Sequence, residues 1–158
     1  MCDFYDAIYT SVGLMKIHIL GIGGTFMAGI AIIAKQLGHQ VTGSDKNLYD
    51  PMKTVLKKSK INYVEGYNPK ILDKKLDLVI VGNVMSRGMP IIEKLLQSNI
   101  KYISGPQWLY ENVLYKKCVI AVSGTHGKTT TSSLVAWILK YAKLNPSYLI
   151  GGQPINFD

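Results

Sequence analysis

The sequence predicts a parallel α/β fold, in which helices cover both faces of a doubly wound sheet. Three observations indicate this class. Short apolar runs alternate with longer segments of helical periodicity, as in proteins built from strand–helix–strand units. Glycine-rich turns follow the runs at 16–20 and 118–122. The run DLVIV at 77–81 is apolar without alternation, which is typical of a central strand covered on both faces.

The first part of the chain contains enough elements for one complete Rossmann-like domain. Five strands are expected, at 16–20, 40–42, 62–65, 77–81 and 101–103. Four helices are expected, at 26–37, 51–58, 90–97 and 106–114. Gly38 and Pro51 support the end of the first helix and the start of the second.

After Lys117 the pattern starts again, with a buried strand at 118–122, a loop at 124–127, a helix at 128–142 and a strand at 148–150. The helix is expected to bury one face, formed by Leu134, Val135, Ile138, Leu139 and Ala142. One crossover unit cannot bury both faces of a sheet, so this second domain is expected to be incomplete. The predicted organisation is a tail at 1–14, a first domain at 15–115 and the start of a second at 116–158. The tail before Met15 is either an accessory segment or the result of a start placed upstream.

Composition excludes several classes of protein. The chain has 158 residues, of which 47% are hydrophobic and 18% charged, a balance typical of globular proteins. Its longest apolar run, 26–34, has nine residues, whereas a membrane span needs about 20. Cys2 and Cys118 form neither a disulfide framework nor a metal-binding spacing, and the first residues do not form a signal peptide. A cytoplasmic protein without a membrane partner is expected.

The net charge of +8 raises the question of nucleic-acid binding. Of the 18 basic residues only Arg87 is an arginine, although bidentate phosphate and base recognition favour arginine. The lysines are scattered between apolar segments, where solvated turns belong. We therefore expect no nucleic-acid partner, and the excess positive charge would suit a small anionic ligand.

The first glycine loop, GIGGTF at 21–26, lies between a strand and a helix, as a dinucleotide-binding loop does. Gly21 permits the turn and Gly23 would let the backbone approach a pyrophosphate at the helix N-terminus. Asp45 ends the next strand, where an acid could meet a ribose hydroxyl or simply lie in a solvated turn. Phe26 occupies the position of the third glycine, and its bulk is expected to crowd the packing of helix on strand. That feature disfavours a nicotinamide or flavin.

The second glycine loop, GTHGKTTT at 124–131, is the strongest motif in the chain. A predicted strand leads in and a predicted helix leads out, as a phosphate-binding loop requires. Its backbone amides would face phosphate oxygens, Lys128 would reach the β- and γ-phosphates, and the Thr129 hydroxyl could ligate Mg²⁺. The loop is shorter than the usual P-loop. His126 fits either a phosphate-proximal role or helix entry.

Together the two loops resemble those of the Mur ligase family, which amidates UDP-N-acetylmuramate with ATP. The resemblance is greatest to the branch that joins a murein tripeptide to that sugar nucleotide in peptidoglycan recycling. Phe26 is similar to that branch, whereas the L-alanine-adding branch usually has glycine. The segments that carry the resemblance are GIGGTFMAGIA at 21–31, HQVTGSDKNLYDPM at 39–52, GNVMSRGMP at 82–90, SGPQWLYENVL at 104–114, GTHGKTTT at 124–131 and IGGQPINF at 150–157.

The resemblance implies a role for each loop. UDP-sugar binding is implied for Gly21, Gly23, Gly24 and Thr25, together with Asp45, Asn83 and Arg87 at strand ends. ATP binding is implied for Gly124, Thr125, His126, Gly127, Lys128, Thr129 and Thr130. Lys128 and Thr129 would act in catalysis, Lys128 by stabilising charge on the transferred phosphoryl group and Thr129 by holding Mg²⁺.

The family is an ATP-dependent acid–amino-acid ligase, but its members are much longer than this chain. Residues that ligate metal and position the amine lie beyond the matching region, so we expect no turnover by the isolated chain. Three alternatives remain open. They are an L-alanine ligase fragment, a non-catalytic module that binds only the UDP-sugar, and a nicotinamide-dependent oxidoreductase, which rests on the first loop alone.

Overall fold

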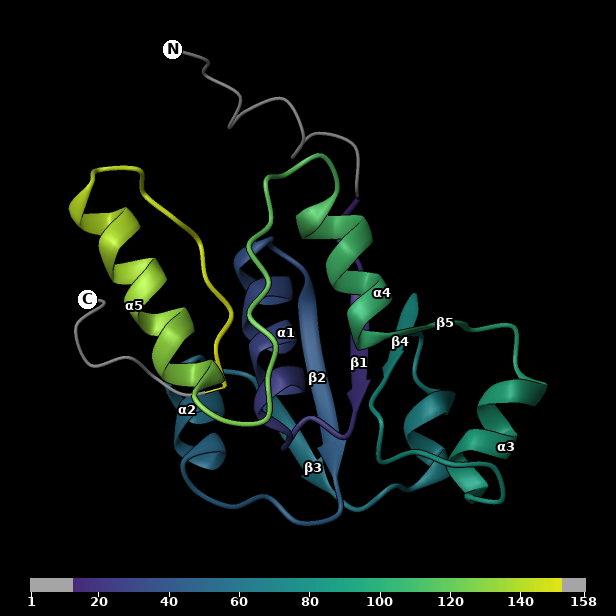
Figure 1. Ribbon diagram of the computed structural model, residues 1–158. Helices are drawn as coiled ribbons and strands as arrows, with labels where there is room; N and C mark the ends of the chain where they lie inside the picture. Colours follow the sequence, from purple (N-terminus) through teal and green to yellow (C-terminus); the bar gives the residue numbers. More distant parts are fainter. Residues whose placement is uncertain (1–12, 152–158) are drawn as a thin grey trace.

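The computed structural model describes residues 13–151 and is built around a five-stranded parallel sheet (Figure 1). The strand order is β3-β2-β1-β4-β5, and every adjacent pair is parallel. The predicted fold class of the first domain is therefore confirmed. The strands are β1 (Lys16–Leu20), β2 (Gln40–Asp45), β3 (Asn62–Glu65), β4 (Leu78–Val81) and β5 (Lys101–Ser104).

The order of the strands reverses at β1, which lies in the middle of the sheet. β2 and β3 lie on one side of it, and β4 and β5 lie on the other. Ile17 of β1 is opposite Val41 of β2 and Leu78 of β4. In open α/β sheets, ligands bind at such a reversal, outside the carboxyl ends of the strands. The fold alone therefore points to the loops that follow β1 and β4.

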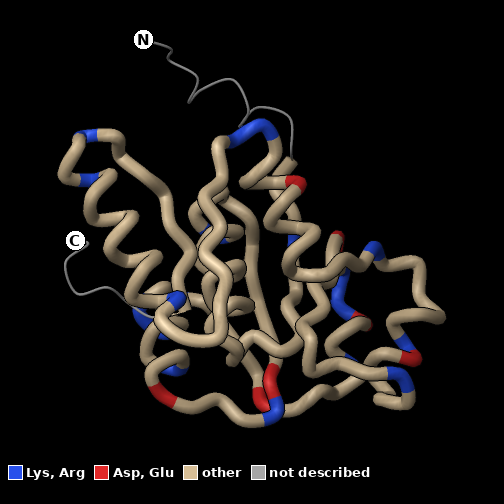
Figure 2. Tube along the Cα trace, in the orientation of Figure 1, with Lys and Arg blue, Asp and Glu red and all other residues tan. Residues whose placement is uncertain are grey.

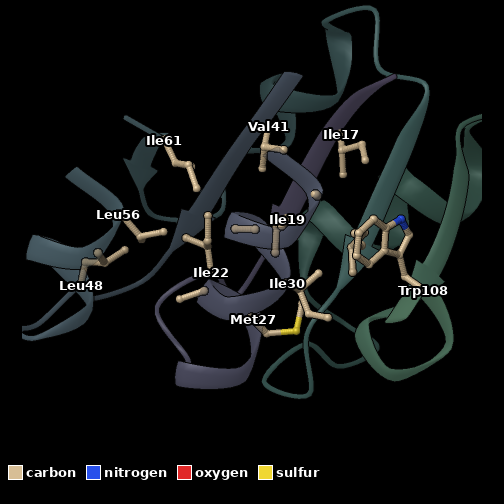
Figure 3. Close-up of a cluster of buried hydrophobic side chains, with 14 residues drawn as sticks. Ile17, Ile19, Ile22, Met27, Ile30, Val41, Leu48, Leu56, Ile61 and Trp108 are labelled. Carbon is tan, nitrogen blue, oxygen red and sulfur yellow. The ribbon is translucent and has the colours of Figure 1, made fainter. Parts of the chain in front are cut away.

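Helices cover both faces of the sheet. α1 (Thr25–Gln36), α2 (Met52–Lys58) and α4 (Gly105–Leu109) lie on one face, and α3 (Pro90–Gln97) and the 3-10 helix η1 (Pro69–Asp73) lie on the other. Figure 3 shows the buried cluster on the first face, in which Ile19 of β1 lies among side chains that include Ile30 and Trp108. Leu20 belongs to the second cluster, because successive side chains of a strand point to opposite faces.

The predicted elements of the first domain are found with small differences in their bounds. The predicted helix at 106–114 is divided into α4 and a π-helical segment, η2 (Tyr110–Leu114). The helix η1 was not predicted. It begins at Pro69, after Asn68 accepts a hydrogen bond from the Lys70 amide. Such a short capped turn lacks the length that makes helical periodicity visible.

Two predicted strands of the second domain are wrong. Residues 118–122 and 148–150 are not strands in this structure, and Val119 and Ile120 are largely exposed. A strand needs a neighbour for its backbone hydrogen bonds, and residues 13–151 contain no second sheet that could supply one. The expected first strand of a P-loop domain is therefore absent from the described part of the chain.

The predicted second helix is present as α5 (Lys128–Tyr141), but its predicted buried face is wrong. Of the five residues of that face, Leu134, Ile138 and Ala142 are exposed, and Val135 and Leu139 are half-buried. Ala136 is the residue of α5 that is buried. α5 stands beside the first domain in Figure 1. The following segment returns to that domain, where Leu149 packs against Gly29 of α1 so closely that a β-carbon at position 29 would collide with it.

Some predictions fall outside the described residues. These are the tail up to residue 12, including Cys2, and the end of the expected second domain after residue 151. Within the described residues, helices are too short or too polar to cross a bilayer. Basic residues lie along the whole trace in Figure 2.

A polar ladder crosses the centre of the sheet on the side of α3. The side chain of His18 is 3% exposed; its Nδ1 lies 2.8 Å from Thr42 Oγ1 and its Nε2 lies 3.1 Å from Ser44 Oγ. A neutral imidazole can satisfy both hydroxyls, because one ring nitrogen donates and the other accepts. Burial, with a smaller contribution from the charge of Lys74, lowers the pKa of His18 to about 4.

The low pKa of His18 makes the stability of the protein depend on pH. Between about pH 6.5 and 4 the unfolded chain binds a proton that the folded chain excludes, so stability should fall as the pH falls through this window. We expect a loss of about 1.5 kcal/mol from His18 between pH 6.5 and 5, measured by urea unfolding. His18→Gln should flatten the dependence, whereas His126→Gln, at an exposed position, should leave it unchanged. Equal pH dependence in wild type and His18→Gln would contradict this assignment.

Candidate functional site

The reversal point of the sheet is formed by two glycine positions in close contact. Gly21 follows β1 with a φ of +81°, and a β-carbon there would lie 2.9 Å from Val84 Cγ2. Gly82 follows β4, and its amide donates to the Leu20 carbonyl at 2.9 Å. A β-carbon on Gly82 would lie 2.7 Å from that same oxygen. The two loops can therefore meet only because both positions lack a side chain.

The end of β2 holds the first glycine loop from the other side. The Ser44 carbonyl accepts hydrogen bonds from the amides of Gly21 at 2.8 Å and Ile22 at 3.2 Å. Ile22 is fully buried and packs over Gly43, where a β-carbon would lie 2.8 Å from its Cβ. The loop is thus fixed by backbone hydrogen bonds and by a buried side chain.

The side chain of Asp45 binds the backbone amide of Gly23, which was expected to approach a pyrophosphate. Its Oδ2 accepts a hydrogen bond from the Gly23 amide at 2.7 Å, and a β-carbon on Gly23 would collide with this carboxylate. The carboxylate therefore already fills the anion position at Gly23. A phosphate group placed there would have to displace Asp45 or accept repulsion from it.

The first turn of α1 offers a better position for an anion. Gly24 is the N-cap, no side chain caps the helix, and no acidic residue lies in its first turn. The amides of an uncapped first turn have no partner within the helix, and the helix dipole favours negative charge there. α1 has 12 residues, so its dipole is well developed. The amides of Thr25 and Phe26 are therefore suited to an anionic group, beside the Gly23–Asp45 contact.

The prediction that Phe26 crowds the packing of helix on strand is wrong. Phe26 is 37% exposed, and the buried neighbours that follow it, Met27 and Ala28, face the core. Space for Phe26 comes from Gly105 at the start of α4. A β-carbon on Gly105 would lie 2.8 Å from Met27 Sδ and 3.0 Å from Phe26 Cε1. The bulk of Phe26 is thus accommodated by a glycine on a different helix.

Asn83 and Arg87 follow β4, as predicted, and both are exposed. Arg87 forms a two-pronged ion pair with Glu93, with contacts of 2.9 and 3.1 Å. This hydrogen bonding raises the pKa of Arg87 and lowers the pKa of Glu93. The guanidinium is therefore already paired with a carboxylate at the start of α3, and a ligand would have to share it.

Tyr67 was missed by sequence reasoning. It follows β3, and its hydroxyl donates to Asp45 Oδ1 at 3.3 Å. The one signal for it was its position just after a predicted strand and a glycine, Gly66. Many loop tyrosines share that signal, so the contact could not be foreseen.

The second loop is formed locally, although no strand precedes it. Gly124 and Gly127 have φ values of +150° and +74°, and Gly127 lies directly before α5. The ammonium group of Lys128 folds back to donate to the carbonyls of Gly124 and Thr125, the latter at 3.2 Å. The Lys128 side chain thus stays within the loop, at the place where a phosphate group would bind. Thr125, His126, Thr129 and Thr130 are exposed.

The described residues only partly fit a magnesium site. Between residues 13 and 151, no three His, Cys, Asp or Glu side chains come together as ligands. Thr129 offers a single hydroxyl at the start of α5. Mg²⁺ accepts several waters and phosphate oxygens, so one hydroxyl can contribute to its binding but does not define a site.

The sequence and the fold of this chain match those of known proteins. The model of the Mur ligase family, catalytic domain, matches residues 16–117, which is more than half of the chain. The chain belongs to the Mur ligase family. A UDP-N-acetylmuramate–L-alanyl-γ-D-glutamyl-meso-2,6-diaminoheptandioate ligase of Escherichia coli is 54% identical over 144 residues. That match covers 91% of this chain and 32% of the E. coli protein, so the chain spans about a third of its relative's length.

Solved structures agree with this membership. The corresponding ligase from Neisseria meningitides superposes with a TM-score of 0.87 and 52% identity, covering 92% of this chain and 45% of that one. The UDP-N-acetylmuramate–alanine ligase of Thermotoga maritima gives a TM-score of 0.78 with 29% identity, covering 89% and 32%. A UDP-N-acetylmuramate–L-alanine ligase of Rickettsia bellii is 38% identical over 143 residues, covering 90% of this chain and 29% of its own length. Within this ligase family, the chain is more similar to the tripeptide-adding relatives than to these L-alanine-adding ones.

Proposed function

We propose that this chain is the amino-terminal, UDP-N-acetylmuramate-binding portion of a murein tripeptide ligase of peptidoglycan recycling in the cytoplasm. The observation that carries the proposal is the uncapped N-terminus of α1 at the reversal of the sheet, next to the loop after β4. The greater identity to tripeptide-adding relatives, 54% against 38%, favours the tripeptide over L-alanine.

In the complete enzyme we propose activation of a carboxylate by ATP. An oxygen of the lactyl carboxylate attacks the γ-phosphorus and ADP leaves, which gives an acyl phosphate. The α-amine of the tripeptide then attacks the acyl carbon, phosphate leaves and the nitrogen loses a proton as the amide forms. Bound Mg²⁺ would supply positive charge to the phosphates. Lys128 would move from the loop carbonyls to the phosphate oxygens, and Thr129 would offer its hydroxyl to the metal.

The residues of the UDP-sugar site would face different parts of the ligand according to their charge. The amides at Thr25 and Phe26 would bind the diphosphate, while Gly21, Gly23 and Gly24 shape the loop. Asp45 would face an uncharged part of the ligand. Asn83 lies next to Gly82 and would reach the sugar end. Arg87 would bind a ligand carboxylate only by sharing its guanidinium with Glu93.

A calorimetric titration of the purified chain with UDP-N-acetylmuramate, without ATP, tests this proposal. We expect saturable one-to-one binding, because the first domain has a complete sheet and two buried clusters of its own. Lys128→Ala should bind with unchanged affinity, since the hydrogen bonds that Lys128 makes within residues 13–151 go to the carbonyls of its own loop. We expect no ligase turnover by either protein. Absence of binding by folded protein would contradict the proposed function.

A non-catalytic module that binds UDP-sugar is the second candidate. It is favoured by the exposed face of α5 and by the absence of a strand at 118–122, because the phosphate loop of the described chain has no sheet to support it. The two candidates predict different results when this chain is mixed with a second polypeptide that contains the remaining two thirds of a relative. Restored tripeptide ligation that depends on Lys128 supports the ligase, and binding without restored ligation supports the module.

A further inference from the structure

The turn after β3 brings a tyrosine to the edge of the candidate site. Gly66 has a φ of +83°, and its amide donates to the Asp45 carbonyl at 2.7 Å. This turn directs Tyr67 back over the end of β2. Its ring packs, partly buried, against the cluster that contains Leu20 and Leu72. The ring is therefore anchored in the core while its hydroxyl reaches Asp45.

The two carboxylate oxygens of Asp45 are used unequally. Oδ2 accepts a short hydrogen bond of 2.7 Å from the Gly23 amide. Oδ1 accepts only long ones, at 3.3 Å from the Tyr67 hydroxyl and 3.4 Å from the Asn47 amide. Hydrogen bonds from a hydroxyl to a carboxylate are usually 2.5–2.7 Å long. Oδ1 can therefore accept a further hydrogen bond, and the Tyr67 hydroxyl beside it can rotate toward another partner.

The charge of Asp45 limits what can bind beside it. A phosphate would be repelled, whereas a neutral hydroxyl could donate to Oδ1 and accept from Tyr67. Burial, and then the nearby Asp45 charge, raise the pKa of Tyr67, so the phenol remains a donor at neutral pH. With the diphosphate at the start of α1, the uncharged group nearest to it in a nucleoside diphosphate is its ribose.

We propose that Tyr67 is a substrate-binding residue whose hydroxyl, together with Asp45 Oδ1, binds a ribose hydroxyl of the nucleoside diphosphate. This inference rests on the proposed function. It assigns Asp45 two separate tasks: Oδ2 fixes the glycine loop through Gly23, and Oδ1 recognises the ligand with Tyr67. A ligand hydroxyl donating to Oδ1 and accepting from Tyr67 would replace the long contact between these two side chains with two hydrogen bonds of ordinary length.

The test measures affinity for UDP and for its 2′-deoxy and 3′-deoxy analogues, with wild type, Tyr67→Phe and Tyr102→Phe. Tyr102 lies on β5 and is 54% exposed, so Tyr102→Phe is the matched control. Wild type should bind one deoxy analogue about tenfold more weakly than UDP, the cost of a hydrogen bond to a charged group. Tyr67→Phe should lose about five- to tenfold for UDP but bind that analogue about as well as wild type does. Tyr102→Phe should behave as wild type.

The outcomes separate this inference from the proposed function. If wild type binds UDP and Tyr67→Phe binds it within twofold, Tyr67 does not contact the ligand and the inference is overturned. If Tyr67→Phe weakens UDP and both analogues equally, Tyr67 acts only on the structure of the loop and the inference is again overturned. If folded wild type binds neither UDP nor UDP-N-acetylmuramate, the proposed function fails and this inference fails with it.

Discussion

Trp108→Ala should lower the free energy of unfolding by about 3–5 kcal/mol, because it removes a large, fully buried side chain from the first cluster. Trp108 is 1% exposed and extends from α4 into the buried cluster shown in Figure 3. Domains are usually stable by only about 5–15 kcal/mol, so a loss of this size would leave much of the chain unfolded under mild denaturant. The measurement is a urea titration followed by far-ultraviolet circular dichroism.

Trp137 provides the matched control, since the chain has two tryptophans. It lies on α5 and is 44% exposed. Trp137→Ala should therefore cost about 1 kcal/mol or less, because less apolar surface leaves the protein interior. Equal losses for the two variants would contradict the description of α5 as a helix that contributes little to the core.

Gly82→Ala should weaken UDP-N-acetylmuramate binding by at least about tenfold and cost about 2–3 kcal/mol of stability. The added methyl group would lie 2.7 Å from the Leu20 carbonyl and 3.6 Å from Gly21 Cα. Leu20 is in the central strand and cannot move away, so the glycine loop must shift instead. Calorimetry reports the affinity and urea unfolding reports the stability.

Gly151→Ala is the control for this experiment, because nothing lies within 4 Å of a β-carbon at that position. It should bind and unfold as the wild type does. A Gly82→Ala protein that is destabilised but retains full affinity would show that the loop after β4 supports the fold without shaping the ligand site.

Most of the first domain could be predicted from local patterns. The helix at 90–97 and the strands at 16–20 and 62–65 have the predicted bounds, because each is set by neighbouring residues: an apolar periodicity, a proline or a glycine. The strand at 118–122 has an equally apolar pattern and does not form. Its residues lack a neighbouring strand within the described chain, and no local pattern can supply one.

The residues of the candidate site were predicted at the ends of strands, and Gly21, Asp45 and Asn83 lie there in the structure, but their contacts were only partly foreseen and their binding role stays a prediction. The first glycine loop lies between a strand and a helix, as predicted, whereas no strand precedes the second loop in the structure. The partners of the polar side chains were not identified. Asp45 was expected either to meet a ribose hydroxyl or to lie in a solvated turn, yet one of its oxygens accepts a hydrogen bond from the Gly23 amide, and Arg87 is already paired with Glu93.

The sequence by itself determined the α/β class, the order of the elements in the first domain and the membership in a ligase family. These follow from periodicity and from motifs of a few consecutive residues. The tertiary structure alone decided which side chains share the site. The contacts of Asp45 with Gly23 and Tyr67 each join residues 22 positions apart. Such contacts depend on the parallel register of β1, β2 and β3, which brings the carboxyl ends of separate strands to one edge of the sheet.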